Sequence, residues 1–122
     1  MSSAGKGILL AFFIVAVSPM ARAQCDDAKT TLQINECFAK ELKKADAELN
    51  GVYRLTIKKL EPAEAVLLRK AQRAWLGYRD AHCEADRAQW DGGTGGPAAF
   101  MSCKLELTRK RTAEIQNTYQ SH

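Results

Sequence analysis

Residues 67–83 read LLRKAQRAWLGYRDAHC, and this stretch predicts one strongly amphipathic helix. Apolar and small residues recur in and just after it at alternating spacings of four and three, which places them on one side of a helix. They are called here the Leu67–Ala85 stripe: Leu67, Ala71, Ala74, Tyr78, Ala81 and Ala85. We expect this stripe to be buried against the rest of the chain.

Two further rows complete this helix. A row seven residues apart flanks the stripe and consists of Leu68, Trp75 and His82. The opposite face carries charged residues, which are Arg69, Lys70, Arg73, Arg79 and Asp80. Trp75 is the largest apolar side chain in the middle of the chain, so we expect neighbouring elements to pack around it. The alternative is that Trp75 contacts a ligand directly.

The first 23 residues have the pattern of a secretory signal peptide. Lys6 supplies a basic start, residues 7–17 form an apolar run too short to span a bilayer, and Ala21-Arg22-Ala23 fits an A-x-A cleavage site. We expect cleavage after Ala23 and a soluble, exported mature chain of residues 24–122. A lipoprotein anchored at Cys25 is the alternative, but the residues before it lack the apolar and small character that such processing needs.

The charge of the mature chain is mild. Removal of Lys6 and Arg22 lowers the 18 basic residues to 16, against 14 acidic residues, so the net charge is about +2. Basic and acidic residues alternate along the expected helices, which is typical of solvated faces. We therefore expect no nucleic-acid partner. We also expect no membrane span, because the apolar run of residues 7–17 is too short for one.

Two more helices flank the central one. Thr30-Thr31-Leu32-Gln33 fits a capping box, which predicts a helix start there, and this helix ends near Leu60. Along it, a seam of mostly apolar residues recurs at helical spacing: Phe38, Leu42, Ala45, Leu49, Val52 and Thr56. Pro62 begins the central helix, which runs to about Ala88. A third helix opens at Ala98 or Ala99, and its apolar side is marked by Phe100, Cys103, Leu107 and Ile115.

These patterns predict an all-α fold, an up-down-up three-helix bundle stapled by disulfides. The short connection at Pro62 makes the first two helices an antiparallel hairpin. Four cysteines in a short exported chain indicate two disulfides. We prefer the pairs Cys25–Cys37 and Cys83–Cys103, with Cys25 lying before the first helix, while Cys37–Cys83 remains a competing pairing.

Residues 90–97, WDGGTGGP, predict an irregular, flexible and exposed loop. It projects from the end of the bundle where the cysteines gather. An aromatic residue stands at its root and polar residues follow, as in loops that recognise a protein partner. The candidate binding residues are Trp90, Asp91, Gly92, Gly93 and Thr94.

Several motifs together resemble a known family. They are Asn35-x-Cys37, Ala45-Asp46-x-x-Leu49-Asn50-x-x-Tyr53, AQRAWLGYRDAHC at residues 71–83, the Gly-Gly-Thr loop, and Cys103 followed by Leu107-Thr108-x-x-Arg111-Thr112-x-Glu114-Ile115. With the signal peptide, they resemble the LprI-like lysozyme-inhibitor family over nearly the whole mature chain. The resemblance implies a disulfide-containing helical protein, a periplasmic or secreted location, and inhibition of lysozyme-type glycosidases.

The motif residues are interpreted as structural framework: Asp46, Trp75, Tyr78, Arg79, Asp80 and Arg111. A partly buried arginine needs a carboxylate or carbonyl partner, because an unpaired buried charge is costly. We therefore expect Asp46 or Asp80 to pair with Arg79 or Arg111. An anion site built from these arginines is the alternative.

The sequence points to a binder and not to an enzyme. No Ser/His/Asp set is evident, and the cysteines are expected to be oxidised. His82 and Asp86 are four residues apart, but two ligands are a weak metal signal. We expect no cofactor and no metal. The expected partner is a protein, with lysozyme the leading candidate, and the chain is expected to be a monomer or weak oligomer. The alternative is an envelope structural or interaction protein that binds a membrane-linked partner or peptidoglycan through its basic helix faces.

Overall fold

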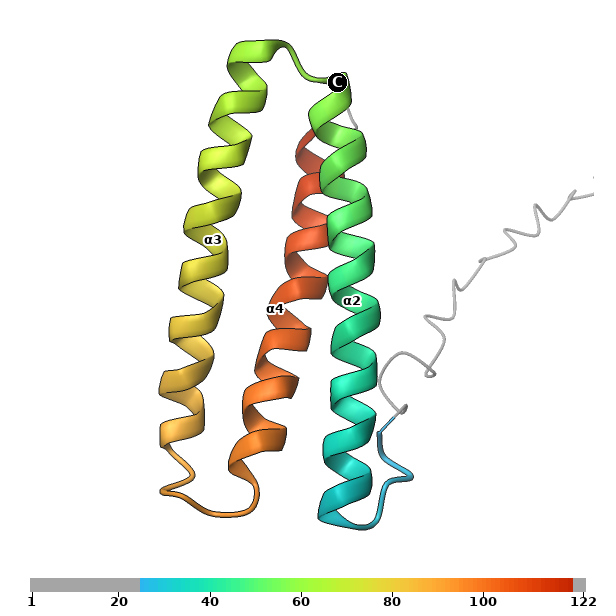
Figure 1. The fold of residues 1–122 in the computed structure, drawn as a ribbon, viewed down its shortest axis with the longest axis vertical. Helices are drawn as coiled ribbons and strands as arrows, with labels where there is room; N and C mark the ends of the chain where they lie inside the picture. The colour runs from blue at the N-terminus through green and yellow to red at the C-terminus, as the bar shows by residue number, and fades with distance from the viewer. Residues whose placement is uncertain (1–24, 120–122) are drawn as a thin grey trace, which may run out of the picture.

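Three long helices that run up, down and up make up the part of the chain that the structure describes. The computed structural model describes residues 25–119, in which α2 spans Thr31–Lys59, α3 spans Pro62–Ala88 and α4 spans Gly96–Tyr119 (Figure 1). The described residues contain no strand, so the predicted all-α bundle is confirmed. The predicted signal peptide, residues 1–23, lies outside the described residues. Between residues 25 and 119, no helix has the length and apolar character needed to cross a bilayer.

The starts of α2 and α3 follow from local sequence. The Thr30 hydroxyl accepts a hydrogen bond from the Gln33 amide at 3.1 Å, and the Gln33 side chain accepts one from the Thr30 amide at 3.2 Å. This is the predicted capping box, which satisfies two backbone donors that a helix start leaves open. Pro62 occupies the first turn of α3, where a missing N–H costs nothing.

The start of α4 differs from the prediction. The helix begins at Gly96, two residues before Ala98. The Ala99 amide donates to the Gly95 carbonyl at 2.9 Å, so the helical hydrogen bonds already include residue 95. Pro97, which was predicted to lie in the loop, lies in the first turn of α4, where its fixed φ suits a helix. The irregular segment is therefore shorter than predicted, and it comprises residues 89–95.

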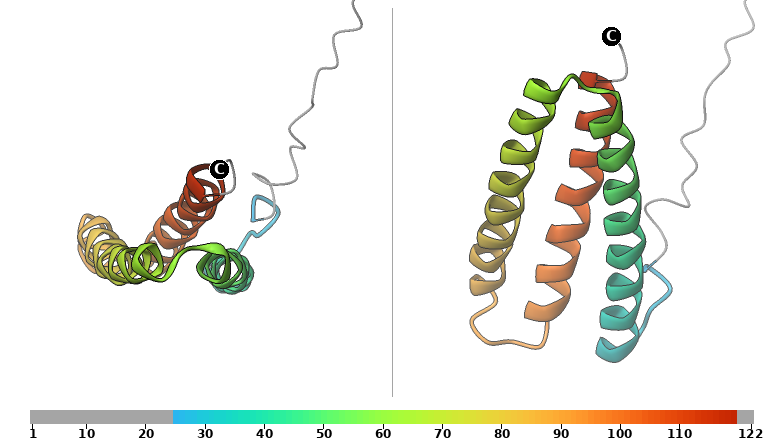
Figure 2. Two further views of the ribbon diagram at one scale, coloured as in Figure 1. Left: turned by 90° about the horizontal axis from the view of Figure 1, so that it is seen from above. Right: turned by 45° about the horizontal axis from the view of Figure 1, so that its top comes forward.

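The helices are arranged around α4 and not around α3. Both α2 and α3 pack against α4, while α2 and α3 make few contacts with each other although only Leu60 and Glu61 connect them. Figure 2 shows this arrangement from above, with α2 and α3 on different sides of α4. The first two helices are antiparallel as predicted, but the hairpin is open.

The core is small and lies where α4 meets its neighbours. Its buried apolar residues are Ala45, Leu49, Ala65, Leu68, Cys83, Leu105 and Ile115. The predicted seam of α2 is confirmed, with Ala45, Leu49 and Thr56 buried along it. On α4, Leu105 and Thr108 are buried although they were not predicted, and Phe100, Cys103 and Leu107 are half-buried. Contact with two helices gives α4 a wider buried surface than one stripe provides.

The predicted burial of the Leu67–Ala85 stripe is wrong. Leu67 is 67% exposed and Tyr78 is 56% exposed, and the four alanines of the stripe are exposed as well. The face of α3 that meets α4 instead carries Ala65, Leu68, Gln72, Arg79 and Cys83. Arg79, which was assigned to the solvated face, is therefore buried. The Leu67–Ala85 stripe and the face with Gln72 and Arg79 both have helical periodicity. The second face is buried because α4 supplies partners for its polar groups.

Two disulfides have the preferred pairing. Cys25 is bonded to Cys37, and Cys83 is bonded to Cys103, each with the two Cα atoms 5.6 Å apart. Cys25 lies before α2, as expected. The Cys83–Cys103 bond joins α3 to α4 and turns the buried face of α3 toward α4. The competing Cys37–Cys83 pairing does not occur.

Candidate functional site

The 89–95 loop is a series of tight turns closed by backbone hydrogen bonds. At the end of α3, the amides of Gln89, Trp90 and Asp91 donate to the carbonyls three residues earlier at 3.0–3.3 Å. The chain then reverses through positive φ angles at Asp91 (46°) and Gly92 (73°). The Gly93 amide donates to the Trp90 carbonyl at 2.8 Å, and a further turn bond reaches residue 96. The loop is thus more ordered by internal bonds than the predicted flexible segment.

The Trp90 side chain packs against Gly95, near the end of this loop. A Cβ atom placed on Gly95 would clash with the six-membered ring of the Trp90 indole, so the ring lies directly against the glycine backbone. This close approach requires a residue without a side chain. Trp90 nevertheless stays 51% exposed. The result is a large aromatic surface that is held by the loop and open to solvent.

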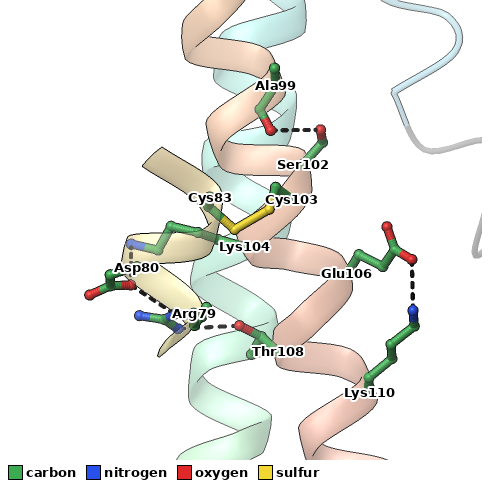
Figure 3. The surroundings of a disulfide bond; sticks show 10 residues. All are labelled: Arg79, Asp80, Cys83, Ala99, Ser102, Cys103, Lys104, Glu106, Thr108 and Lys110. Carbon is green, nitrogen blue, oxygen red and sulfur yellow. Dashed lines mark hydrogen bonds and ion pairs between the residues drawn. A yellow bond between two sulfur atoms is a disulfide. The ribbon is translucent and has the colours of Figure 1, made fainter. Parts of the chain in front are cut away.

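The base of the loop is fixed to the bundle. The Cys83–Cys103 disulfide ties α3 to α4 (Figure 3). Cys83 lies in the last turns of α3, and Cys103 lies in the first turns of α4. Nearby, the Arg87 guanidinium and the Lys104 ammonium lie 5.8 Å and 5.1 Å from the centre of the Phe100 ring. The Arg87–Phe100 cation–π contact adds to the packing between α3 and α4, while the Lys104 contact lies within α4.

An open hollow of about 360 Å³ lies beside the loop. Its lining includes charged residues of α3 and backbone of the loop and of the first turn of α4: Glu84, Arg87, Ala88, Gly92, Gly93, Thr94, Gly96 and Pro97. Three of the five candidate binding residues, Gly92, Gly93 and Thr94, line the hollow. Trp90 and Asp91 belong to the same loop but do not line it.

A second cluster is centred on Arg79. Its side chain is 8% exposed and donates to Asp46 of α2 at 2.9 Å. It also donates to Thr108 of α4 at 3.2 Å and to Asp80 at 3.0 Å (Figure 3). The guanidinium carbon also lies 5.4 Å from the centre of the Trp75 ring. One side chain thereby links all three helices, which supports the framework interpretation of these residues.

Arg111 extends this cluster along α4. It donates to the Gln72 side chain at 3.0 Å and pairs with Glu114 at 3.1 Å. Its guanidinium lies 5.9 Å from the Trp75 ring centre, so the half-buried indole meets two guanidinium groups. The guanidinium groups of Arg79 and Arg111 already donate to side chains of neighbouring helices. These contacts indicate a structural role for the two arginines and argue against an anion site.

Tyr78 does not join this cluster. It lies on the exposed Leu67–Ala85 stripe and stacks on His82, with the ring centres 5.5 Å apart. His82 and Asp86 border a shallow surface hollow together with residues of α4. Among residues 25–119, no three His, Cys, Asp or Glu side chains come close enough together to hold a metal ion.

Sequence reasoning missed several members of the framework. Thr108 and Gln72 are buried polar residues that accept from the two arginines. Glu41 of α2 is also buried and pairs with Lys44 at 3.2 Å and with Arg109 of α4 at 3.4 Å. Each of these residues looks like a surface residue in the sequence. Each lies three, four or seven residues from a predicted core position, and this spacing could have predicted their burial.

The fold and site define a small helical protein with two disulfides and one exposed, disulfide-anchored loop. A family model described as "Lysozyme inhibitor LprI" matches residues 21–115, so this chain belongs to the LprI lysozyme-inhibitor family. The description of this family names lysozyme inhibition. Membership, together with the disulfides, points to an exported protein.

Two relatives extend the comparison. The chain is 35% identical to the uncharacterized protein R02472 of Rhizobium meliloti (strain 1021), with 93% of this chain and 91% of that protein covered. It is 29% identical to the uncharacterized protein YecT of Escherichia coli (strain K12), with 84% of this chain and 73% of that protein covered. No solved structure gives a significant match.

Proposed function

We propose that this protein binds and inhibits a lysozyme-type glycosidase, and that the 89–95 loop makes the decisive contact. Membership of the LprI family, over residues 21–115, is the observation that carries this proposal. The loop is the element best suited to the task, because it combines exposure, backbone order and an aromatic anchor. A large aromatic side chain at a rigid position is a common centre of binding energy in protein interfaces.

The chemistry of the loop suits a glycosidase cleft. Such clefts are lined by carboxylates, which accept hydrogen bonds from backbone N–H groups and hydroxyls. Gly92 and Gly93 allow the backbone to approach closely, and Thr94 supplies a hydroxyl group. The turn hydrogen bonds and the Cys83–Cys103 disulfide reduce the ordering cost on binding.

Local charge offsets the mild positive charge of the chain. A cationic target would be repelled by a basic binding surface, and encounter would slow. The end of the bundle that carries the loop also carries exposed carboxylates at Glu84, Asp86 and Asp91. We expect Asp91 to face a basic rim of the target and not its catalytic carboxylates.

Export is part of this proposal. Residues 1–23 are proposed to be a signal peptide that is cleaved after Ala23, which delivers the chain to the periplasm or the outside of the cell. The two disulfides support this, since such bonds persist in oxidising compartments. Intact-mass measurement of the protein recovered from the periplasm and medium should give a chain that begins at Gln24.

The functional test compares three variants in a lysozyme inhibition assay. Trp90→Ala should raise the inhibition constant at least tenfold, about 1.4 kcal/mol. Replacement of Gly92 by Asn and Thr94 by Ala should weaken inhibition similarly, because it adds a side chain and removes the hydroxyl group. Asn at position 92 tolerates the positive φ, and Gly93 is kept because an added Cβ would lie 3.0 Å from the Trp90 carbonyl oxygen. Leu55→Ala is the matched control, since Leu55 is 56% exposed on α2, and it should leave inhibition unchanged.

Two outcomes would overturn the proposal in different ways. If the wild-type protein inhibits no lysozyme, the inhibitor function fails, and an envelope protein that binds peptidoglycan or a membrane-linked partner becomes the better interpretation. If it inhibits and the loop variants inhibit equally well, the loop is only a connector. The search for the contact would then move to the basic face around Arg73. Thermal melts of each variant establish that the fold is retained.

A further inference from the structure

The Leu67–Ala85 stripe is an apolar helix side that the other described residues, within 25–119, do not cover. α3 packs against α4 and makes few contacts with α2, so its outer side is open. Leu67 and Tyr78 are 67% and 56% exposed, and the alanines between and beyond them are exposed too. Such a continuous apolar side of a soluble helix marks an interaction surface more often than an isolated exposed leucine does.

We propose that a second copy of this chain covers the stripe, with the two α3 helices paired antiparallel around a two-fold axis at residue 76. The reversed helix then places stripe residues opposite stripe residues, because their spacing is symmetric about this position. Leu67 faces Ala85, Ala71 faces Ala81, and Ala74 faces Tyr78. Every large side chain meets an alanine, which lets the helices approach closely and interdigitate. A parallel pairing would instead oppose Leu67 to Leu67 and Tyr78 to Tyr78.

Charge favours the same arrangement. Lys70 and Glu84 are both exposed, and each immediately precedes a stripe residue, so both lie along one edge of the stripe. In the antiparallel pair, Lys70 of one copy comes beside Glu84 of the other, and the two-fold axis repeats this contact. Edge positions of this kind set partner choice and orientation in paired helices. A parallel pair would bring neither Lys70 nor Glu84 to an opposite charge.

The expected dimer is weak. Six stripe residues, four of them alanine, contribute less than the roughly 800 Å² per partner of a typical stable interface. We expect a dissociation constant on the order of 10 μM, which corresponds to a dimer that forms at high local concentration. The Trp90 loop lies beyond the C-terminal end of the stripe, and the proposal does not rest on lysozyme inhibition.

Sedimentation equilibrium of the purified, oxidised protein tests the pairing. Ala74→Glu places a charge near the two-fold axis and should raise the dissociation constant of the dimer at least tenfold. Ala47→Glu, at an exposed alanine of α2, is the matched control and should leave it unchanged. A protein that stays monomeric up to about 1 mM, or a dimer that both variants leave intact, would overturn the proposal. Loss of lysozyme binding by Ala74→Glu in a monomeric protein would assign the stripe to the target instead.

A charge exchange tests the orientation. Lys70→Glu and Glu84→Lys should each weaken the dimer severalfold, because each creates two like-charge contacts in the antiparallel pair. The double variant K70E/E84K should restore the wild-type dissociation constant, since it re-creates the opposite charges with reversed sign. Failure of the double variant to recover would contradict the antiparallel arrangement. Circular dichroism melts of the three variants should match the wild type, since both residues are exposed.

Discussion

Arg79 of α3 donates a hydrogen bond to Asp46 of α2 at 2.9 Å, and this ion pair links two helices that otherwise make few contacts. The same guanidinium reaches Thr108 of α4, so it fixes the position of α3 relative to both other helices. The position of α3 in turn sets where the 89–95 loop leaves the bundle. The cluster around Arg79 and the candidate binding loop are therefore mechanically connected through α3.

Removal of the Arg79 side chain should destabilise the fold. Arg79→Ala eliminates three hydrogen bonds and the contact with Trp75, and we expect a loss of about 2–4 kcal/mol in the free energy of unfolding. Arg73→Ala, on the exposed face of the same helix, should change it by less than about 0.5 kcal/mol. Urea denaturation followed by circular dichroism measures both. Equal effects of the two substitutions would contradict the framework role of Arg79.

Asp46 should matter less than Arg79. Its side chain is 42% exposed, and water replaces part of the interaction when the carboxylate is lost. Asp46→Asn should therefore cost about 1 kcal/mol, because Arg79 keeps Asp80 and Thr108 as partners. The same urea titration measures this change. A loss as large as that of Arg79→Ala would show that the link between α2 and α3 alone holds the bundle.

Trp75 should contribute to stability through packing against two arginines. Its indole is half-buried between the guanidinium groups of Arg79 and Arg111, so Trp75→Ala should cost about 2–4 kcal/mol, near the lower range for a fully buried aromatic. Trp75→Phe should recover more than half of this loss, since a phenyl ring retains an aromatic face. A loss below about 1 kcal/mol for Trp75→Ala would mean that the ring serves a ligand and not the fold.

Gly51 offers a stabilising substitution. It lies in the interior of α2, and a Cβ atom added there meets no other atom within 4 Å. Gly51→Ala should raise the free energy of unfolding by about 0.5–1 kcal/mol, because alanine restricts the unfolded chain and favours the helix. Gly95→Ala is the contrasting control and should disturb the loop, since its Cβ would meet the Trp90 ring. A destabilised Gly51→Ala protein would contradict the packing described for α2.

The Cys83–Cys103 disulfide should support both stability and binding. The double variant Cys83→Ala/Cys103→Ala opens a link between residues 20 positions apart and should lower stability by about 3 kcal/mol. It should also weaken lysozyme inhibition, because the base of the loop loses its covalent tie. The variant that removes Cys25–Cys37 should leave inhibition unchanged, since that bond ties the N-terminal arm to α2 and does not join α3 to α4. If loss of Cys25–Cys37 weakened inhibition and loss of Cys83–Cys103 did not, the inhibitory surface would not include the loop.

Local signals in the sequence predicted the helices well. Thr30 with Gln33 marked the start of α2, Pro62 marked the start of α3, and the apolar spacing predicted the seam of α2. These features depend on backbone hydrogen bonds and periodicity within a few residues. The exposed position of Trp90 was predicted for the same reason, because a glycine-rich segment excludes regular structure around it.

Tertiary packing decided what local signals did not. The alanines of the Leu67–Ala85 stripe and the face with Gln72 and Arg79 have equal helical periodicity, so apolar character alone selected the wrong side of α3. Gln72 and Arg79 are buried because Arg111, Asp46 and Thr108 satisfy their polar groups. The Cys83–Cys103 bond turns that face toward α4. A firm disulfide assignment would have selected the correct side.

The central claim is that Trp90 contacts the target enzyme, and fluorine NMR tests it most directly. Trp75 and Trp90 are the only tryptophans of the chain, so incorporation of 5-fluorotryptophan gives two signals, which Trp75→Phe and Trp90→Phe assign. Titration with an unlabelled lysozyme that the protein inhibits should shift or broaden the Trp90 signal and leave the Trp75 signal in place. A titration that forms the complex while the Trp90 signal stays unchanged would contradict the account.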